Sequence, residues 1–137
     1  MKSLIFFILS FLIVSYSSAL TKPEKGWIYV DTAIQTQDRV YIGEKSISIN
    51  HADSKKVNFW MMIQHKQKQS GFGSAKAYLT GDCKSSRVQT NRVVAFSGDY
   101  LTGDDSLQPT SKEWFEAPST TLFGGVLRYA CSALGKL

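Results

Sequence analysis

The middle of the chain alternates between apolar and polar side chains, as a strand with one buried face does. Between residues 57 and 67, the odd positions up to 63 are apolar, whereas the even positions mix aromatic, amide and basic side chains. Residues 75–83 alternate in the same way, and the glycine-containing connection at 69–73 has the length of a hairpin loop. Because successive side chains of a strand point to opposite faces, the pattern predicts an antiparallel hairpin with one face in the core.

Further segments rich in β-branched and aromatic residues extend this sheet: 27–30, 40–42, 47–49 and 87–96. Together with the hairpin they predict an antiparallel sheet of about five to six strands. In the last segment, Val88, Val94 and Phe96 share one parity and are expected to lie on the buried face.

The period changes near the C-terminus, where apolar residues between 122 and 134 recur at the spacing of one helical face. Residues 118–121 supply N-cap candidates, and Gly135 supplies a stop. Gly124 and Gly125 each weaken the helix by about 1 kcal/mol, so packing must stabilise it, and we expect them to mark a close approach of the helix to the sheet. The predicted fold class is α+β, an antiparallel sheet with a C-terminal helix packed on one face.

Two cysteines, Cys83 and Cys131, follow the apolar N-terminus. Cys83 lies on the buried parity of its strand and Cys131 on the apolar stripe of the helix, so a disulfide between them ties strand to helix. Closing this loop stabilises the fold by about 4 kcal/mol in the chain-entropy model. The alternative, a reactive or metal-binding pair, has no CxxC spacing and no nearby histidine to support it.

The N-terminus has the pattern of a cleaved secretory signal over residues 1–19. Lys2 precedes an apolar run of about 11 residues, which is shorter than the about 20 that a membrane-spanning helix needs. Small residues at 17–19 suit signal peptidase, and no cysteine stands directly after the run to accept a lipid. We therefore expect one domain at 20–137 that is extracytoplasmic (periplasmic, secreted or associated with the outer membrane) and not lipid-anchored.

Composition changes this picture little, but charge adds to it. The chain of 137 residues is 43% hydrophobic and 20% charged, which argues against disorder. Between residues 55 and 92, eight basic residues accompany one acid, Asp82. Between residues 99 and 116, five acids accompany one base, Lys112. The middle of the chain is therefore a basic surface candidate.

The outward parity of the hairpin interleaves aromatic and basic side chains. It carries Gln64 and Thr80, and Asn91 extends it on the next strand. Such a face suits an acidic protein segment or a sulfated glycan, and a merely solvated face is the alternative. The candidate binding residues are Trp60, Lys66, Lys68, Lys76, Tyr78 and Arg87.

Other residue types raise alternatives. His51 and His65 are the acid–base pair that a small secreted hydrolase such as a ribonuclease requires, but no other element supports catalysis. No nucleic-acid motif is present. The Asp/Gly-rich segment 97–105 invites a calcium site, although it lacks the EF-hand ligand order, and a solvated loop is the prediction. Trp114 and Phe115 are expected to pack beneath the helix. No cofactor is expected.

In combination, the segments resemble the surface-adhesin protein E family of Gram-negative bacteria. The matching segments are 27–32, 57–60, the strand leading into Asp82 and Cys83, the strand at Arg87, and 127–131. The resemblance implies a sheet packed on a helix, a strand-to-helix disulfide and no catalytic activity. It also implies binding to host matrix proteins, with a homodimer among the expected states. The family's name-giving member is lipid-anchored, and this chain lacks the cysteine for that anchor. A periplasmic binding or envelope-interaction module without an adhesive role is the alternative.

Overall fold

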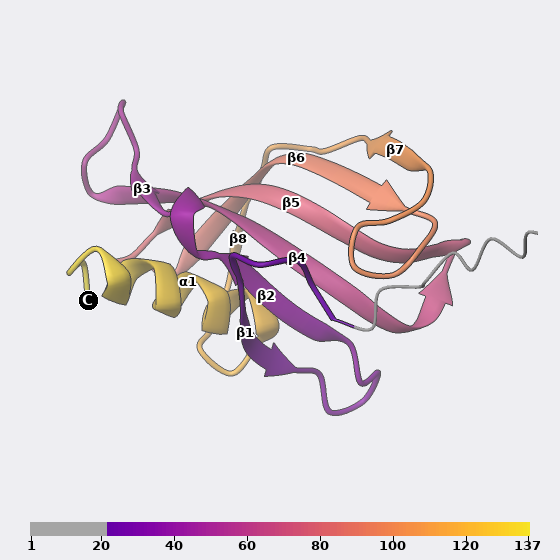
Figure 1. Cartoon of the computed structure of the whole chain (residues 1–137). Helices are drawn as coiled ribbons and strands as arrows, with labels where there is room; N and C mark the ends of the chain where they lie inside the picture. Colours follow the sequence, from indigo (N-terminus) through magenta and orange to yellow (C-terminus); the bar gives the residue numbers. More distant parts are fainter. Residues whose placement is uncertain (1–21) are drawn as a thin grey trace, which may run out of the picture.

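The computed structural model describes residues 22–137, so the predicted signal segment 1–19 lies outside the described part. Eight strands, one 3-10 helix and one α-helix follow in chain order (Figure 1). They are β1 (Trp27–Thr32), β2 (Arg39–Gly43), η1 (Glu44–Ser46), β3 (Ser48–Ile49), β4 (Lys56–Gln69), β5 (Phe72–Asp82), β6 (Arg87–Phe96), β7 (Asp105–Gln108), β8 (Trp114–Glu116) and α1 (Leu122–Ala133).

The strands form one antiparallel sheet in the order β1-β2-β4-β5-β6-β7, with β3 paired to β4 and β8 paired to β6. The predicted α+β class, the antiparallel sheet and the C-terminal helix are confirmed. The sheet has eight strands where five to six were predicted, because β7 and β8 are too short to show a clear alternation of apolar residues.

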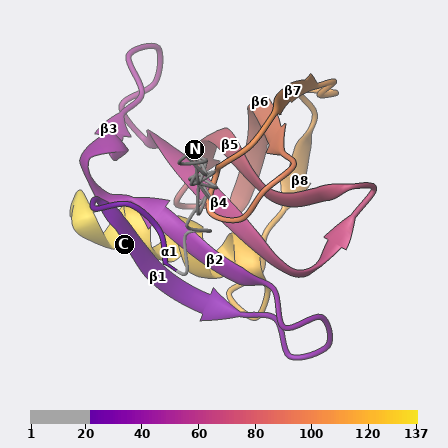
Figure 2. The same ribbon diagram turned by 45° about the vertical axis from the view of Figure 1, so that its right-hand side comes forward.

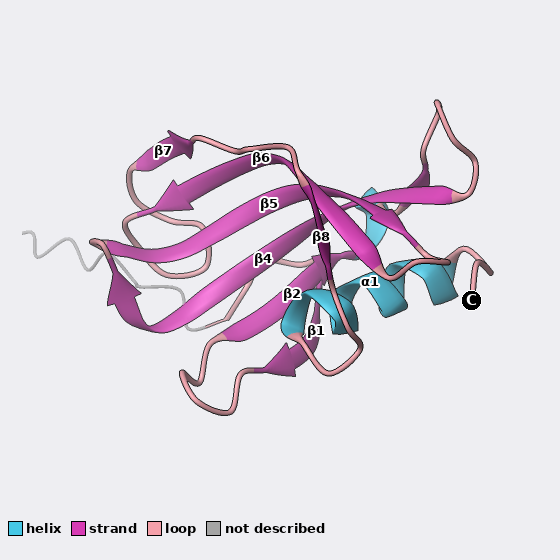
Figure 3. Ribbon diagram, turned by 180° about the vertical axis from the view of Figure 1, so that it is seen from behind, coloured by secondary structure: helices cyan, strands magenta, loops and turns pink. Residues whose placement is uncertain are grey.

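The helix α1 covers one face of the sheet (Figure 3). Val57, Phe59 and Met61 of β4 are almost completely buried there, as the alternation predicts. They share one core with Val126 and Leu127 of α1. The alternation of side chains along β4 therefore decides which face of the sheet packs against the helix. We call the opposite face of the sheet the outer face.

The helix approaches the sheet closely at Gly81 of β5. A Cβ added at this glycine would overlap the Cδ1 of Leu127. The expectation that Gly124 and Gly125 mark this approach is wrong. A Cβ at Gly124 overlaps the carbonyl of Pro118, in the segment that leads into the helix, and a Cβ at Gly125 has only an ordinary 3.7 Å contact with Val30. The helix begins as predicted, with the Oγ1 of Thr121 accepting from the Gly124 amide at 3.1 Å.

The disulfide between Cys83 and Cys131 is confirmed, with 5.8 Å between the two Cα atoms. Cys83 directly follows β5, and Cys131 lies completely buried in the last turns of α1. The bridge therefore fixes the helix to the end of a central strand.

A bulge in β6 changes the parity of that strand. Tyr78 pairs with Arg92, but the next residue of β5, Leu79, pairs with Thr90, so Asn91 is an extra residue. Val88, which precedes the bulge, faces the helix as predicted, whereas Val94, which follows it, pairs with Lys76 on the outer-face parity. The prediction that Val88, Val94 and Phe96 share the buried face is therefore confirmed for Val88 and wrong for Val94 and Phe96.

The outer face is itself partly covered, by the loop between β6 and β7, which folds back over the sheet (Figure 2). Tyr100 of this loop packs with Tyr41 and Met62, and burial raises the pKa of the Tyr100 hydroxyl. The Gln64 amide holds the loop, because its Nε2 donates to Asp99 at 2.9 Å and its Oε1 accepts from the Tyr100 amide at 2.6 Å. Gln64 is therefore buried, and the segment 97–105 is not the freely solvated loop that was predicted.

Candidate functional site

The outer face brings three of the predicted binding residues together. Trp60 of β4 lies opposite Tyr78 of β5 in the register, and their ring centres are 5.1 Å apart. The Nζ of Lys76, two residues before Tyr78, lies 4.9 Å from the centre of the Trp60 ring. A cation at this distance is attracted to the face of an indole, so Lys76 and Trp60 hold each other in place.

Around this pair is a hollow of about 290 Å³, which we call the basic-aromatic hollow. It collects residues from four parts of the chain: residues 25–27 at the start of β1, the end of β2 with η1, β4 and β5. Its lining residues are Lys25, Gly26, Trp27, Gly43, Lys45, Ser46, Trp60 and Lys76. The candidates from the sequence include only Trp60 and Lys76 of these.

Local hydrogen bonds position the walls of the basic-aromatic hollow. The Oγ of Ser46 donates to the Gly43 carbonyl at 2.5 Å and accepts from the Trp60 amide at 2.9 Å, which fixes η1 against β4. The Glu44 amide donates to the Gly26 carbonyl at 3.0 Å, which ties the start of η1 to the turn that precedes β1. Gly26 has a φ of 104°, a conformation that favours glycine at this turn.

The lining of the basic-aromatic hollow is entirely without acidic residues. Its charged groups are the ammonium groups of Lys25, Lys45 and Lys76, and within residues 22–137 none of the three forms an ion pair. Like charges gathered on one concave surface produce a positive potential that attracts anions. Trp27 and Trp60 add flat apolar contact area beside those charges.

The other three predicted binding residues lie elsewhere. Lys66 and Lys68 line a separate hollow at the far end of β4, together with residues 35–38. There Asp38 accepts from the Lys66 amide at 3.0 Å and contacts the Nδ1 of His65 at 3.2 Å. Arg87 begins β6, opposite Asp82 in the register. Of the predicted basic residues, only Lys76 therefore lies in the basic-aromatic hollow, and Lys66, Lys68 and Arg87 lie outside it.

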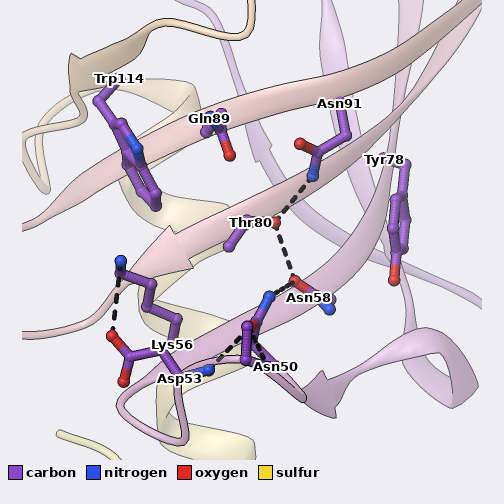
Figure 4. A pocket seen from close by; sticks show the side chains of 10 residues that line it. Asn50, Asp53, Lys56, Asn58, Tyr78, Thr80, Gln89, Asn91 and Trp114 are labelled. Carbon is purple, nitrogen blue, oxygen red and sulfur yellow. Dashed lines mark hydrogen bonds and ion pairs between the residues drawn. The ribbon is translucent and has the colours of Figure 1, made fainter.

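Another hollow, of about 510 Å³, occupies the outer face beyond Tyr78 (Figure 4), and we call it the polar hollow. Side chains of β4, β5 and β6 line it, with the loop before β4 and Trp114 of β8 at its sides. The lining residues are Asn50, Ala52, Asp53, Lys56, Asn58, Tyr78, Thr80, Gln89, Asn91 and Trp114.

Trp114 stands on the outer face, so its predicted position beneath the helix is wrong. Phe115, the next residue of β8, points the other way, and its ring centre lies 5.2 Å from that of Phe123 in α1. Trp114 instead lies under Lys56, whose Nζ is 4.9 Å from the ring centre and 3.5 Å from the Asp53 carboxylate. A hydrogen bond from the Lys55 amide, together with Lys56, lowers the pKa of Asp53.

The two histidines are not brought together. His51 lies in the exposed loop before β4, and His65 lies far along β4 beside Asp38. The structure therefore does not assemble the acid–base pair that a hydrolase of the ribonuclease kind needs. Within residues 22–137, no three His, Cys, Asp or Glu side chains group as metal ligands, the segment 97–105 included. In the same part of the chain, no helix is long and apolar enough to cross a membrane.

Comparisons with known proteins agree with this fold. The family described as Surface-adhesin protein E matches residues 27–132. The solved structure of Haemophilus influenzae protein E superposes with a TM-score of 0.68 at 15% identity, covering 88% of this chain and 94% of that one. A second crystal form of that protein gives 0.65 at 15% identity, covering 87% and 97%. At this identity the likeness shows the fold alone. A search of curated proteins found no significant match.

Proposed function

Because the chain belongs to the surface-adhesin protein E family, we propose that it is an adhesin-like protein that binds an acidic partner through the basic-aromatic hollow. The partner is a host matrix protein with an acidic segment, or a sulfated glycan. The protein acts outside the cytoplasm by binding, without a catalytic step.

The observation that carries this proposal is that Lys25, Lys45 and Lys76 line one hollow together with two indole rings, and that no acidic residue is in this lining. The three lysines come from segments that are far apart in the sequence. A solvated charged surface normally mixes both signs. A cluster of one sign in a hollow instead favours a ligand of the opposite charge.

The lysines and the tryptophans of the hollow contribute to binding in different ways. The lysines attract an anion from a distance and raise the rate of encounter, an effect that salt weakens. Trp27 and Trp60 supply contact area with few rotatable bonds, so little entropy is lost when they bind. Tyr78 supports the Trp60 ring from the next strand. Lys66, Lys68 and Arg87 extend the positive potential beyond the hollow.

The test compares two variants of equal charge. Lys25, Lys45 and Lys76 are changed to Glu in one variant, and Lys66, Lys68 and Lys84 are changed to Glu in the control. Binding to immobilised heparin and to matrix proteins is measured at low and at high salt. We expect the dissociation constant of the first variant to rise at least about tenfold more than that of the control. Both variants lose the same net charge, but only the first loses the lysines that line the hollow.

Equal losses in the two variants contradict the assignment to this hollow. An absence of saturable binding at low salt contradicts the adhesive proposal itself and favours a partner within the bacterial envelope.

A further inference from the structure

The polar hollow has features that the proposed function does not use. Its two aromatic side chains, Tyr78 and Trp114, stand at opposite sides of a floor made of amide and hydroxyl groups (Figure 4). Its volume of about 510 Å³ lies in the range of small-molecule sites, about 300–1,000 Å³. We propose that the polar hollow binds an uncharged saccharide unit, a hexose or an N-acetylhexosamine.

The floor is a chain of side-chain hydrogen bonds that fixes the orientation of each amide. Asn91 Nδ2 donates to the Thr80 Oγ1 at 2.8 Å, and this hydroxyl donates to the Asn58 Oδ1 at 2.9 Å. The same Asn58 oxygen accepts from Asn50 Nδ2 at 3.1 Å. The Asn50 Oδ1 in turn accepts from the backbone amides of Ala52 and Asp53, which holds the loop at the side of the hollow.

These hydrogen bonds leave a defined set of polar atoms free to bind a ligand. Asn58 uses its oxygen twice, and within the described part of the chain its Nδ2 has no protein partner. Asn91 and Gln89 each donate through their amide nitrogen, to Thr80 and to the Lys112 carbonyl respectively. Their amide oxygens are then available as acceptors. A sugar hydroxyl both donates and accepts, so it matches neighbouring amide donors and acceptors better than an anion, which only accepts.

The bulge in β6 contributes to this arrangement. Asn91 shares the parity of Gln89, opposite to that of Val88, so it lies on the outer face. As the extra residue of the bulge it has no partner opposite it in the register of β5, and its side chain reaches Thr80. Bulges often re-aim a side chain next to a functional site. Here the bulged residue itself carries one of the hydrogen-bonding groups of the floor.

Charge separates the two hollows. The only charged side chains that line the polar hollow are Lys56 and Asp53, and they are 3.5 Å apart. They largely neutralise each other, so this hollow offers no net attraction to a sulfated or acidic ligand. The rings of Tyr78 and Trp114 instead provide apolar faces on which the C–H groups of a sugar ring pack.

The experiment uses the purified protein and three uncharged probes: N-acetyllactosamine, tri-N-acetylchitotriose and maltotriose. Binding is followed by calorimetry and by the shifts of side-chain amide and indole signals in NMR spectra, up to about 10 mM probe. The first probe resembles host glycans, and the second resembles the glycan of the bacterial wall, so their relative affinities distinguish the two sources.

Two variants test the site. Trp114→Ala removes a wall, and Asn58→Asp keeps the accepting oxygen of the floor but replaces the free donor. We expect each variant to weaken binding about tenfold, and a salt increase from about 0.05 to 0.5 M to leave the affinity within about twofold. Lys45→Gln, which alters a residue that lines only the basic-aromatic hollow, serves as the control and should bind as the wild type does.

Absence of binding for all three probes overturns the proposal, and so does binding that both variants retain unchanged. Heparin binding is measured in a separate experiment. If the uncharged probes do not bind, the proposal for the basic-aromatic hollow still stands, and if heparin does not bind, the proposal for the polar hollow still stands.

Discussion

The ammonium of Lys76 lies 4.9 Å from the centre of the Trp60 ring, and the two residues come from neighbouring strands on the outer face. This pair places a positive charge and a flat apolar surface at one point of the basic-aromatic hollow. The strength of the interaction depends on charge, because a cation is attracted to the negative face of the ring.

The first prediction concerns this pair. Lys76→Gln keeps most of the side-chain length but removes the charge, so we expect the dissociation constant for heparin to rise about fivefold. Lys76→Arg keeps the charge and stacks on indole rings as well as lysine does, so it should bind within about twofold of the wild type. Surface plasmon resonance measures both. Equal weakening by the two substitutions means that shape, and not charge, determines binding.

The second prediction compares the adjacent glycines of α1. Gly124→Ala places a Cβ against the Pro118 carbonyl, which belongs to the backbone and yields little, so we expect it to lower the free energy of unfolding by at least about 2 kcal/mol. Gly125→Ala meets only Val30 at 3.7 Å and should stabilise the helix by about 0.5–1 kcal/mol. Urea unfolding followed by circular dichroism tests both, and the opposite order of stability contradicts the described packing.

The third prediction concerns the disulfide. Changing Cys83 and Cys131 together to Ala removes a cross-link between residues 48 positions apart. The expected loss in the free energy of unfolding is about 4 kcal/mol in the chain-entropy model. Intact-mass analysis of the wild type after alkylation without reductant should find no free thiol. If reductant leaves the unfolding midpoint unchanged, the bridge does not contribute in this way.

The fourth prediction concerns pH. Burial alone raises the pKa of Asp82, but hydrogen bonds from the Ser85 and Lys84 amides outweigh it and hold the pKa below its ordinary 3.8. A carboxylate with a depressed pKa in the folded state stabilises the fold above its unfolded pKa and loses this contribution as the pH falls. The free energy of unfolding of the wild type should therefore exceed that of Asp82→Asn at neutral pH by about 0.5–1 kcal/mol.

This difference should shrink as the pH decreases below 3.8, because the carboxyl group is then protonated first in the unfolded and later in the folded protein. Urea titrations of both proteins over this range measure it. A difference that stays constant down to the lowest pH indicates that the charge of Asp82 has no part in the effect.

Much of the fold follows from local patterns in the sequence. The alternation along β4 placed Val57, Phe59 and Met61 in the core, and the helical stripe and N-cap placed α1, because both features depend on neighbours a few residues apart. The disulfide followed because both cysteines lie on apolar parities. The bulge at Asn91 was not predictable, since one inserted residue inverts the parity of a strand without a change in composition.

The candidate site was predicted only in part, for a related reason. Trp60, Lys76 and Tyr78 belong to one hairpin, so their neighbourhood is encoded locally. Lys25 and Lys45 reach the same hollow only because β1 and β2 pair next to β4, a long-range choice that no short pattern records. Tyr100 also packs on the outer face, and its loop buries Gln64. This contact joins residues 36 positions apart, so no local pattern predicts it.

The three tryptophans of the chain report on the two hollows separately. Trp27 and Trp60 line the basic-aromatic hollow, whereas Trp114 lines the polar hollow. The most direct test of the proposed function is therefore a titration of the ¹⁵N-labelled protein with a heparin oligosaccharide, followed through the three indole N–H signals. We predict that the signals of Trp27 and Trp60 shift in a saturable way, while that of Trp114 stays in place. A shift of Trp114 alone, or shifts of none of the three at saturation, contradicts binding through the basic-aromatic hollow.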